Sequence, residues 1–377
     1  MSGADYEDQK DPTPNFESHA LIHSVGGIVA YTHPCRWWLG EWGGRGIYPV
    51  EKHKYVSNLA QELPFDTIAG PTYDCLDILM PTKEREVNEH GQQLWFMLLN
   101  KGYRIPGTAS SDATFDNPGR GVPGVVRVYT KIDGGLSVPA VAKAMKAGRN
   151  FVTSGPLMSF SVEGCLPGEA IRLDRTRPLK CKLRAWASGA FGEFLTRVEL
   201  IRSGELVSVV HLADHPTAFT HECEVTASGN GWILARCFGS DPITQVAISN
   251  PIYIETTSYQ SPPQAIASVN ISIADAADGR KLDGTYEVLE CIGRQSKVNF
   301  QGVISEGRTK IEASPIARIR VAAPGYHPMT KSIFLDHKPV YDATVNMRLE
   351  QLLSWDTFDQ LRESLKNVIF DYALDRA

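Results

Sequence analysis

The sequence predicts a mixed fold class: an incomplete α/β domain, then two antiparallel β-sandwiches, then a C-terminal helix. Helix and strand patterns alternate as far as residue 155, and from Leu157 short alternating strands punctuated by Gly, Pro, Ser and Asn replace them. The last stretch, "SWDTFDQLRESLKNVIFDYAL", repeats apolar residues at helical spacing behind a Ser354 N-cap. These changes predict domains over 1–156, 157–256 and 257–350, and a helix in 351–377.

The first region is a series of helices and strands. In order, these are the helix "PNFESHALIHSV" closed by Gly26, the strand "GIVAYT", a helix around "EKHKYVSNLAQEL", the strand "CLDILM", the helix "NEHGQQLWFMLLNKG", the strands "YRIPGTAS" and "VVRVYTKI", the helix "SVPAVAKAMKAG" and the strand "NFVTS". Such alternation predicts a parallel sheet with helices outside. Functional groups of these folds lie where strands end, which marks His33 and Asp112 as candidate site residues.

The two sandwiches are predicted from strands that recur about every ten residues. The first contains "LKCKLRAWAS", "TRVELIRSG", "LVSVVHL", "HECEVTA", "GWILARCFG" and "PIYIET". "TTSYQSPPQ" follows as a linker, and "VNISIAD", "GTYEVLECIG" and "ARIRVAAPGYHP" belong to the second.

Composition bounds the function. The net charge of −5 and the lack of a long basic run argue against a nucleic-acid partner, and no apolar window reaches the length of a membrane span. The polar, acidic N-terminus is not a signal peptide, so the chain as it stands predicts the cytoplasm, or export if residues precede this start. The seven cysteines form no CxxC pair and are expected to be mostly buried free thiols.

His33 and Asp112 together suit a metal centre, because imidazole and carboxylate bind Zn, Mn or Fe, and these ions make hydroxide from bound water near neutral pH. A core histidine capping a strand end is the equally weighted alternative for His33. His19 and His23 share a helix face without the glutamate of a zinc motif, which favours a solvated face. Arg149 is a candidate clamp for a phosphate or carboxylate, against the default of a surface arginine.

The loop "CRWWLGEWGG" after His33 gathers three tryptophans, which line a substrate pocket or form an apolar plug over the sheet. The sequence holds no nucleophile elbow, P-loop or dinucleotide fingerprint.

The segments "GGIVAYTHP", "LWFMLLNKGYRIPGTASSDATFDN" and "VRVYTKIDGGLSVPAVAKAMKAGRNFVTSGPLMSFSVEG" resemble, in this order, the CehA/McbA-like metallohydrolases of the PHP superfamily. The resemblance covers roughly the first 160 residues and continues into the sandwich as far as Glu255. It implies a partial PHP-type βα-barrel, a divalent metal (Zn, Mn or Fe) bound by His33 and Asp112, and hydrolysis of a small ester, phosphoester or carbamate. The motif "APGYHP" resembles carboxypeptidase-regulatory or transthyretin-like sandwiches.

The chain also departs from that family. The HxH motif, the further histidine and the acidic ligand of the family's early barrel have no counterpart, and Ala113-Thr114 follows Asp112 where Asp-x-His is common. Two ligands are fewer than the three protein ligands usual at a catalytic zinc. Three hypotheses explain the missing ligands: the chain is a fragment, it is a degenerate protein, or it is a subunit that completes its barrel with another chain.

Two functions follow from the sequence. One is a metal-dependent hydrolase in which His33 and Asp112 bind the metal and Arg149 holds an anion. The other is a non-catalytic binding or structural protein, in which a degenerate barrel displays β-sandwiches that contact glycans or proteins. The oligomeric state stays open in both.

Overall fold

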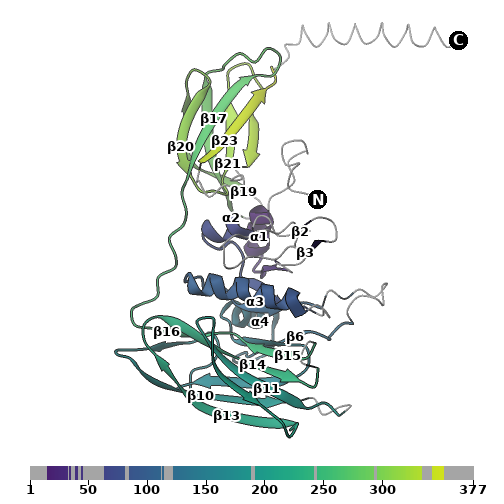
Figure 1. Cartoon of the computed structure of the whole chain (residues 1–377). Helices are drawn as coiled ribbons and strands as arrows, with labels where there is room; N and C mark the ends of the chain where they lie inside the picture. The colour runs from purple at the N-terminus through teal and green to yellow at the C-terminus, as the bar shows by residue number, and fades with distance from the viewer. Residues whose placement is uncertain are drawn as a thin grey trace, which may run out of the picture. The chain divides into compact units, whose positions relative to one another are not determined.

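The computed structural model describes residues 15–32, 34, 39–40, 44–45, 63–80, 85–111, 113, 122–187, 192–241, 244–292, 295–332 and 342–351. The chain divides into two compact units, Met1–Gln264 and Ala265–Ala377 (Figure 1). The predicted C-terminal helix over 351–377 lies outside the described residues, apart from residue 351. The domain boundaries predicted at 156, 256 and 350 stay predictions.

The first unit is built on an eight-stranded sheet, in which β12-β11-β14-β15-β7-β6 form the main path and β16 and β9 join it beside β14. A three-stranded sheet of order β13-β10-β8 packs on one face. The strands are β6 Arg127–Thr130, β7 Asn150–Thr153, β8 Leu157–Val162, β9 Ala170–Arg172, β10 Arg177–Trp186, β11 Leu195–Arg202, β12 Glu205–His211, β13 Ala218–Ala227, β14 Gly231–Gly239, β15 Val246–Ser249 and β16 Ile252–Glu255.

The strand β14 of the large sheet is buried on both of its faces. Ile233 and Cys237 face the three-stranded sheet within one core, whereas Trp232 and Leu234 belong to a second core on the opposite face. Continuous burial of this kind is typical of a strand covered on both sides. The predicted sandwich is therefore present, and a further layer covers its outer face.

That further layer contains helix α3 (Arg85–Asn100), which lies against the large sheet in Figure 1, and a small parallel sheet of order β1-β4-β5. The strands of this small sheet are β1 Ala30–Tyr31, β4 Cys75–Leu79 and β5 Gly107–Ala109. Trp95 and Phe96 of α3 continue an aromatic row to Trp232, with ring centroids 5.7 and 5.0 Å apart. The remaining elements are α1 Asn15–Ser24, α2 Leu63–Ile68, α4 Val138–Lys146 and the hairpin strands β2 Leu39–Gly40 and β3 Gly44–Arg45.

Local signals placed most of these elements correctly. Helix α1 ends before Gly26, whose φ of 77° supplies the left-handed turn that follows a helix. Gly102 does the same after α3 with a φ of 91°. The segment "EKHKYVSNLAQEL" lies almost entirely outside the described residues, and the helix seen next is α2.

The prediction of a partial βα-barrel needs a correction. The described parallel sheet has three strands, which is a half-barrel sheet only. β6 and β7 were expected to extend it, but they pair antiparallel to each other, and β7 pairs antiparallel to β15. The cause is a long-range partner: β15 comes more than ninety residues after β7, as the bond from Ser154 N to Val246 O shows, and it draws both strands into the sandwich.

The second unit contains two sheets, of order β20-β17-β23 and β19-β18-β21-β22. Its strands are β17 Ala267–Asp275, β18 Gly284–Ile292, β19 Gln295–Ile304, β20 Arg308–Ala313, β21 Arg318–Ala322, β22 Met329–Ser332 and β23 Asp342–Leu349. β17 alternates strictly, with Val269, Ile271 and Ile273 buried. This is the pattern of a sheet with one face in a core, as in a β-sandwich. Across the described residues, no helix has the length and apolar character to cross a membrane.

A buried histidine in α1 makes the stability of the first unit depend on pH. His19 is 8% exposed, its Nδ1 lies 2.9 Å from the Thr72 hydroxyl, and its ring packs edge-on against Tyr31. Burial, followed by the nearby charge of His23, lowers the pKa of His19 to about 4, although the Asp66 carboxylate lies 4.0 Å away. The imidazole is therefore neutral in the folded protein at pH 5, whereas the unfolded chain protonates it.

We expect the free energy of unfolding to be about 2 kcal/mol lower at pH 5 than at pH 7.5 on account of His19. The sign follows because the unfolded state binds the extra proton, so stability is lost as the pH falls from about 6.5 towards 4. Urea denaturation of the wild type and of His19→Gln across this range measures the effect. In His19→Gln, the free energy of unfolding should fall less between pH 7.5 and pH 5 than in the wild type. An equal fall in both proteins would contradict the lowered pKa of His19.

Candidate functional site

The two expected metal ligands, His33 and Asp112, both lie outside the described residues. The structure does show the strand ends next to them: β1 ends at Tyr31, and β5 ends at Ala109. Within the described ranges, no group of three or more His, Cys, Asp and Glu side chains comes close enough together to hold a metal ion. The roles given to His33 and Asp112 therefore stay predictions.

The other sequence candidates have ordinary structural partners. His23 Nε2 lies 2.8 Å from the Asp74 carboxylate, and Lys146 reaches the other oxygen of Asp74 at 3.2 Å. Of the tryptophan-rich loop, only the hairpin strands Leu39–Gly40 and Gly44–Arg45 are described.

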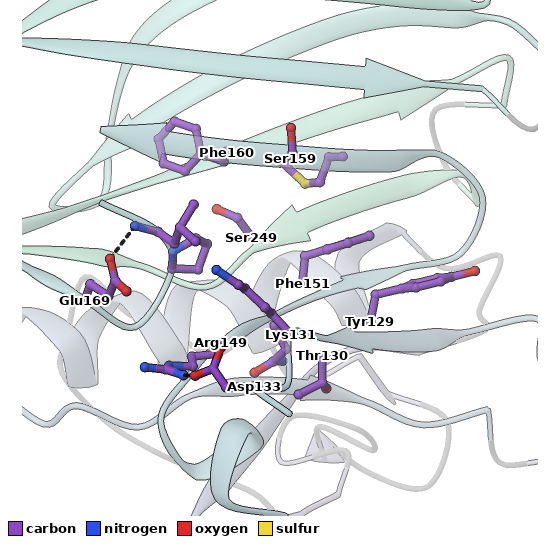
Figure 2. Close-up of a pocket in the computed structure, with 14 residues that line it drawn as sticks. Tyr129, Thr130, Lys131, Asp133, Arg149, Phe151, Ser159, Phe160, Glu169 and Ser249 are labelled. Carbon is purple, nitrogen blue, oxygen red and sulfur yellow. Dashed lines mark hydrogen bonds and ion pairs between the residues drawn. The ribbon is translucent and has the colours of Figure 1, made fainter. Parts of the chain in front are cut away.

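A pocket of about 480 Å³ opens instead between the two layers of the sandwich, where β7 leads into β8 (Figure 2). Strands β6 and β7 form one side of it, β8 forms the other, and the turn around Pro167 closes one end. Phe160 and Met158 of β8 contribute the apolar wall and are each 4% exposed. The size falls within the range of small-molecule sites.

An aromatic pair lies in this pocket. Tyr129 of β6 and Phe151 of β7 are opposed in the antiparallel ladder, so their side chains share one face of the sheet. Their rings are stacked, with centroids 5.1 Å apart and planes 7° from parallel. Tyr129 is 41% exposed and Phe151 is half-buried, so the pair presents a flat apolar surface to the cavity and to solvent.

Four charged side chains line the same pocket. Arg149 is the one sequence candidate that the pocket includes, and it forms an ion pair with Asp133. Glu169 accepts a hydrogen bond from the backbone N–H of Leu166 at 2.9 Å. Figure 2 shows the Lys131 side chain extending into the space between the strands, and among the described residues its ammonium has no ion-pair partner. The pocket therefore offers two positive and two negative groups.

The floor of the pocket is tied to the rest of the unit by Asn150, which is 4% exposed. Its Nδ2 donates to the carbonyl of Gly107 in β5 at 3.0 Å, which links the pocket to the small parallel sheet. Sequence reasoning missed this site, because the strands "VVRVYTKI" and "NFVTS" were assigned to a parallel sheet. The usable signal was the aromatic and charged side chains that alternate along "VYTKID".

No family model and no curated protein matches the chain. Among solved structures, the major pilin subunit BcpA of Bacillus cereus is 9% identical, over 53% of this chain and 72% of that chain, with a TM-score of 0.18. A Mobiluncus mulieris adhesin with intramolecular disulfide, isopeptide and ester bond cross-links is 9% identical, over 53% of this chain and 100% of that chain, with a TM-score of 0.18. The group B streptococcus pilus 2b backbone protein is 8% identical, over 51% of this chain and 98% of that chain, with a TM-score of 0.18. Scores this low assign no common fold.

The expected kinship with the CehA/McbA-like metallohydrolases of the PHP superfamily is therefore wrong. No family model matches the chain, and the described parallel sheet has three strands where the barrel of that superfamily was expected. The labels of hydrolase and metal-binding protein are corrected with that kinship, and nothing in the described residues supports the expected ester or phosphoester substrate. What remains from the sequence is a chain with β-sandwich modules.

Proposed function

We propose that the chain is a non-catalytic binding protein, and that the pocket between β6, β7 and β8 takes up a neutral sugar residue of a glycan. One observation carries the proposal: the stacked pair of Tyr129 and Phe151 lies within a pocket whose rim is polar and charged. A pyranose ring has this same division, because its axial C–H groups form an apolar face and its edge carries hydroxyl groups.

The polar groups suit hydroxyl recognition. Glu169 and Asp133 accept hydrogen bonds, and Lys131 and Arg149 donate them. A sugar hydroxyl can do both, so it can pair with either kind of group. Because the charges of these four side chains balance, the pocket offers no net attraction to an acid or a base. A cavity of about 480 Å³ has room for one or two sugar rings.

The test is a glycan array followed by titration calorimetry on the purified chain. We expect binding of neutral glycans, and an affinity about tenfold weaker in Phe151→Leu, because leucine keeps apolar bulk but removes the flat ring face. Phe219→Leu is the matched control, since Phe219 packs against the sandwich core and is not part of the pocket. It should bind like the wild type.

Melting curves of both variants separate binding from folding. Two results would overturn the proposal: a folded wild-type chain that binds no glycan, or glycan binding that Phe151→Leu leaves unchanged.

A further inference from the structure

Two cysteines face each other across neighbouring strands of the three-stranded sheet. Cys181 of β10 and Cys223 of β13 are direct partners in an antiparallel ladder that runs without a register shift from Arg177 to Trp186. Both thiols are free. Among the described residues, no other two cysteines are strand partners. Directly opposed residues place their side chains on the same face of a sheet, so the two sulfur atoms lie in one layer.

That layer is the edge of the sandwich core. Cys181 is 2% exposed and belongs to the core cluster, whereas Cys223 is half-buried and packs against it. Opposed residues in an antiparallel ladder alternate between hydrogen-bonded and non-hydrogen-bonded pairs. Ala187 N donates to Thr217 O at 2.8 Å, so Ala187 and Thr217 are a hydrogen-bonded pair. Cys181 lies an even number of positions, six, before Ala187 in the same register and therefore belongs to the same kind of pair. Cys181 and Cys223 thus form a hydrogen-bonded pair, whose Cα atoms lie about 5.5 Å apart. Disulfides most often span about 5.5–6 Å between Cα atoms.

We propose that Cys181 and Cys223 are a site of reversible disulfide formation, closed by exchange with a small-molecule disulfide such as oxidised glutathione. In the first step the Cys223 thiolate attacks one sulfur of the small disulfide, a mixed disulfide forms, and one small thiolate leaves. In the second step the Cys181 thiolate attacks the Cys223 sulfur, and the second small thiolate leaves. The two protons of the protein thiols end on the two small thiols, so the small disulfide is reduced as the protein pair is oxidised.

The order of the steps follows from access. Cys223 is the more exposed of the two, so a small disulfide reaches it first. Burial raises the pKa of the Cys181 thiol to about 12. Burial also raises the pKa of the Cys223 thiol, although a hydrogen bond with Ser208 acts to lower it. Because thiolates are the nucleophiles, the reaction should accelerate as the pH rises above neutral.

The product should be easy to reduce. Cβ atoms of directly opposed residues lie about 4.5–5.5 Å apart, whereas a relaxed disulfide holds them about 3.5–4.5 Å apart. Closing the bond therefore draws the two strands together by roughly an ångström, and this strain favours the dithiol. A pair of this kind responds to the redox state around the protein, because strained disulfides have the more oxidising potentials.

The experiment treats the folded chain with oxidised glutathione at alkaline pH and maps its peptides without reduction. We expect a peptide cross-linked between Cys181 and Cys223, a melting temperature about 5 °C higher, and full reversal by reduced glutathione. Cys237→Ser and Cys165→Ser are matched controls and should keep the cross-link, whereas Cys223→Ser should lose it. A folded wild-type chain in which Cys223 carries glutathione but never links to Cys181, or in which neither thiol reacts, overturns the proposal.

Discussion

Replacing Asn250 by alanine should lower the free energy of unfolding by about 3 kcal/mol. Asn250 is 1% exposed and follows β15, and its Oδ1 accepts the backbone N–H of Gly107 at 2.7 Å. Its Nδ2 donates to the Gly107 carbonyl at 3.0 Å and to the Asn150 carbonyl at 3.1 Å. One side chain therefore joins β5 of the small parallel sheet to two strands of the large sheet. Alanine leaves the Gly107 N–H buried without a partner, which costs more than the lost bonds alone.

Denaturation followed by tryptophan fluorescence measures this effect, since Trp95 and Trp232 are buried in the same unit. Asn230→Ala is the matched control: Asn230 accepts bonds from the N–H and hydroxyl of Thr256 at 2.8 and 3.0 Å, but at an exposed site where water replaces them. We expect the control to change stability little. An Asn250→Ala protein as stable as the wild type would show that the two sheets are held together by apolar packing alone.

The same joint explains which parts of the fold the sequence could predict. Helices α1 and α3 and strand β4 were predicted because periodicity and a closing glycine are local signals. No local signal determines the direction in which β6 and β7 pair. That direction depends on β15, which pairs with β7 from far along the chain, and on Asn250, which bonds to Asn150 of β7. The helix α4 between β6 and β7 suggested a parallel crossover, but these strands are antiparallel neighbours in the structure.

The candidate site was missed for a related reason. Arg149 was identified as a possible anion clamp, and the structure places it at the pocket in an ion pair with Asp133. The stacked rings of Tyr129 and Phe151 become a pair only through the antiparallel register of β6 and β7. Since a parallel sheet was expected, the sequence could supply the residue types of the pocket but not their juxtaposition.

Removing the Glu199 carboxylate should have the largest effect on stability. Glu199 of β11 is 4% exposed, and its Oε2 lies 2.7 Å from one terminal nitrogen of Arg236 and 2.9 Å from its Nε. Arg236 also donates to the Gln92 side chain of α3 at 2.8 Å, so the ion pair fixes the helix on the sheet. The Glu199 side chain is 5% exposed and that of Arg236 is 21% exposed, so little solvent is available to replace either partner.

We expect Glu199→Ala to cost about 3–5 kcal/mol, because it leaves the guanidinium of Arg236 without its counter-charge, and also that of Arg197, whose Nε lies 2.9 Å from Glu199 Oε1. Glu222→Ala is the matched control: Glu222 pairs with Lys182 on the exposed side of β10 and β13, and the variant should melt like the wild type. The double variant Glu199→Leu with Arg236→Met separates the two contributions. If the cost of the single variant comes mainly from the charge stranded on Arg236, the double variant is more stable than Glu199→Ala. If it comes from the contact between Arg236 and Gln92, the double variant is less stable, since it loses the attachment of α3 as well.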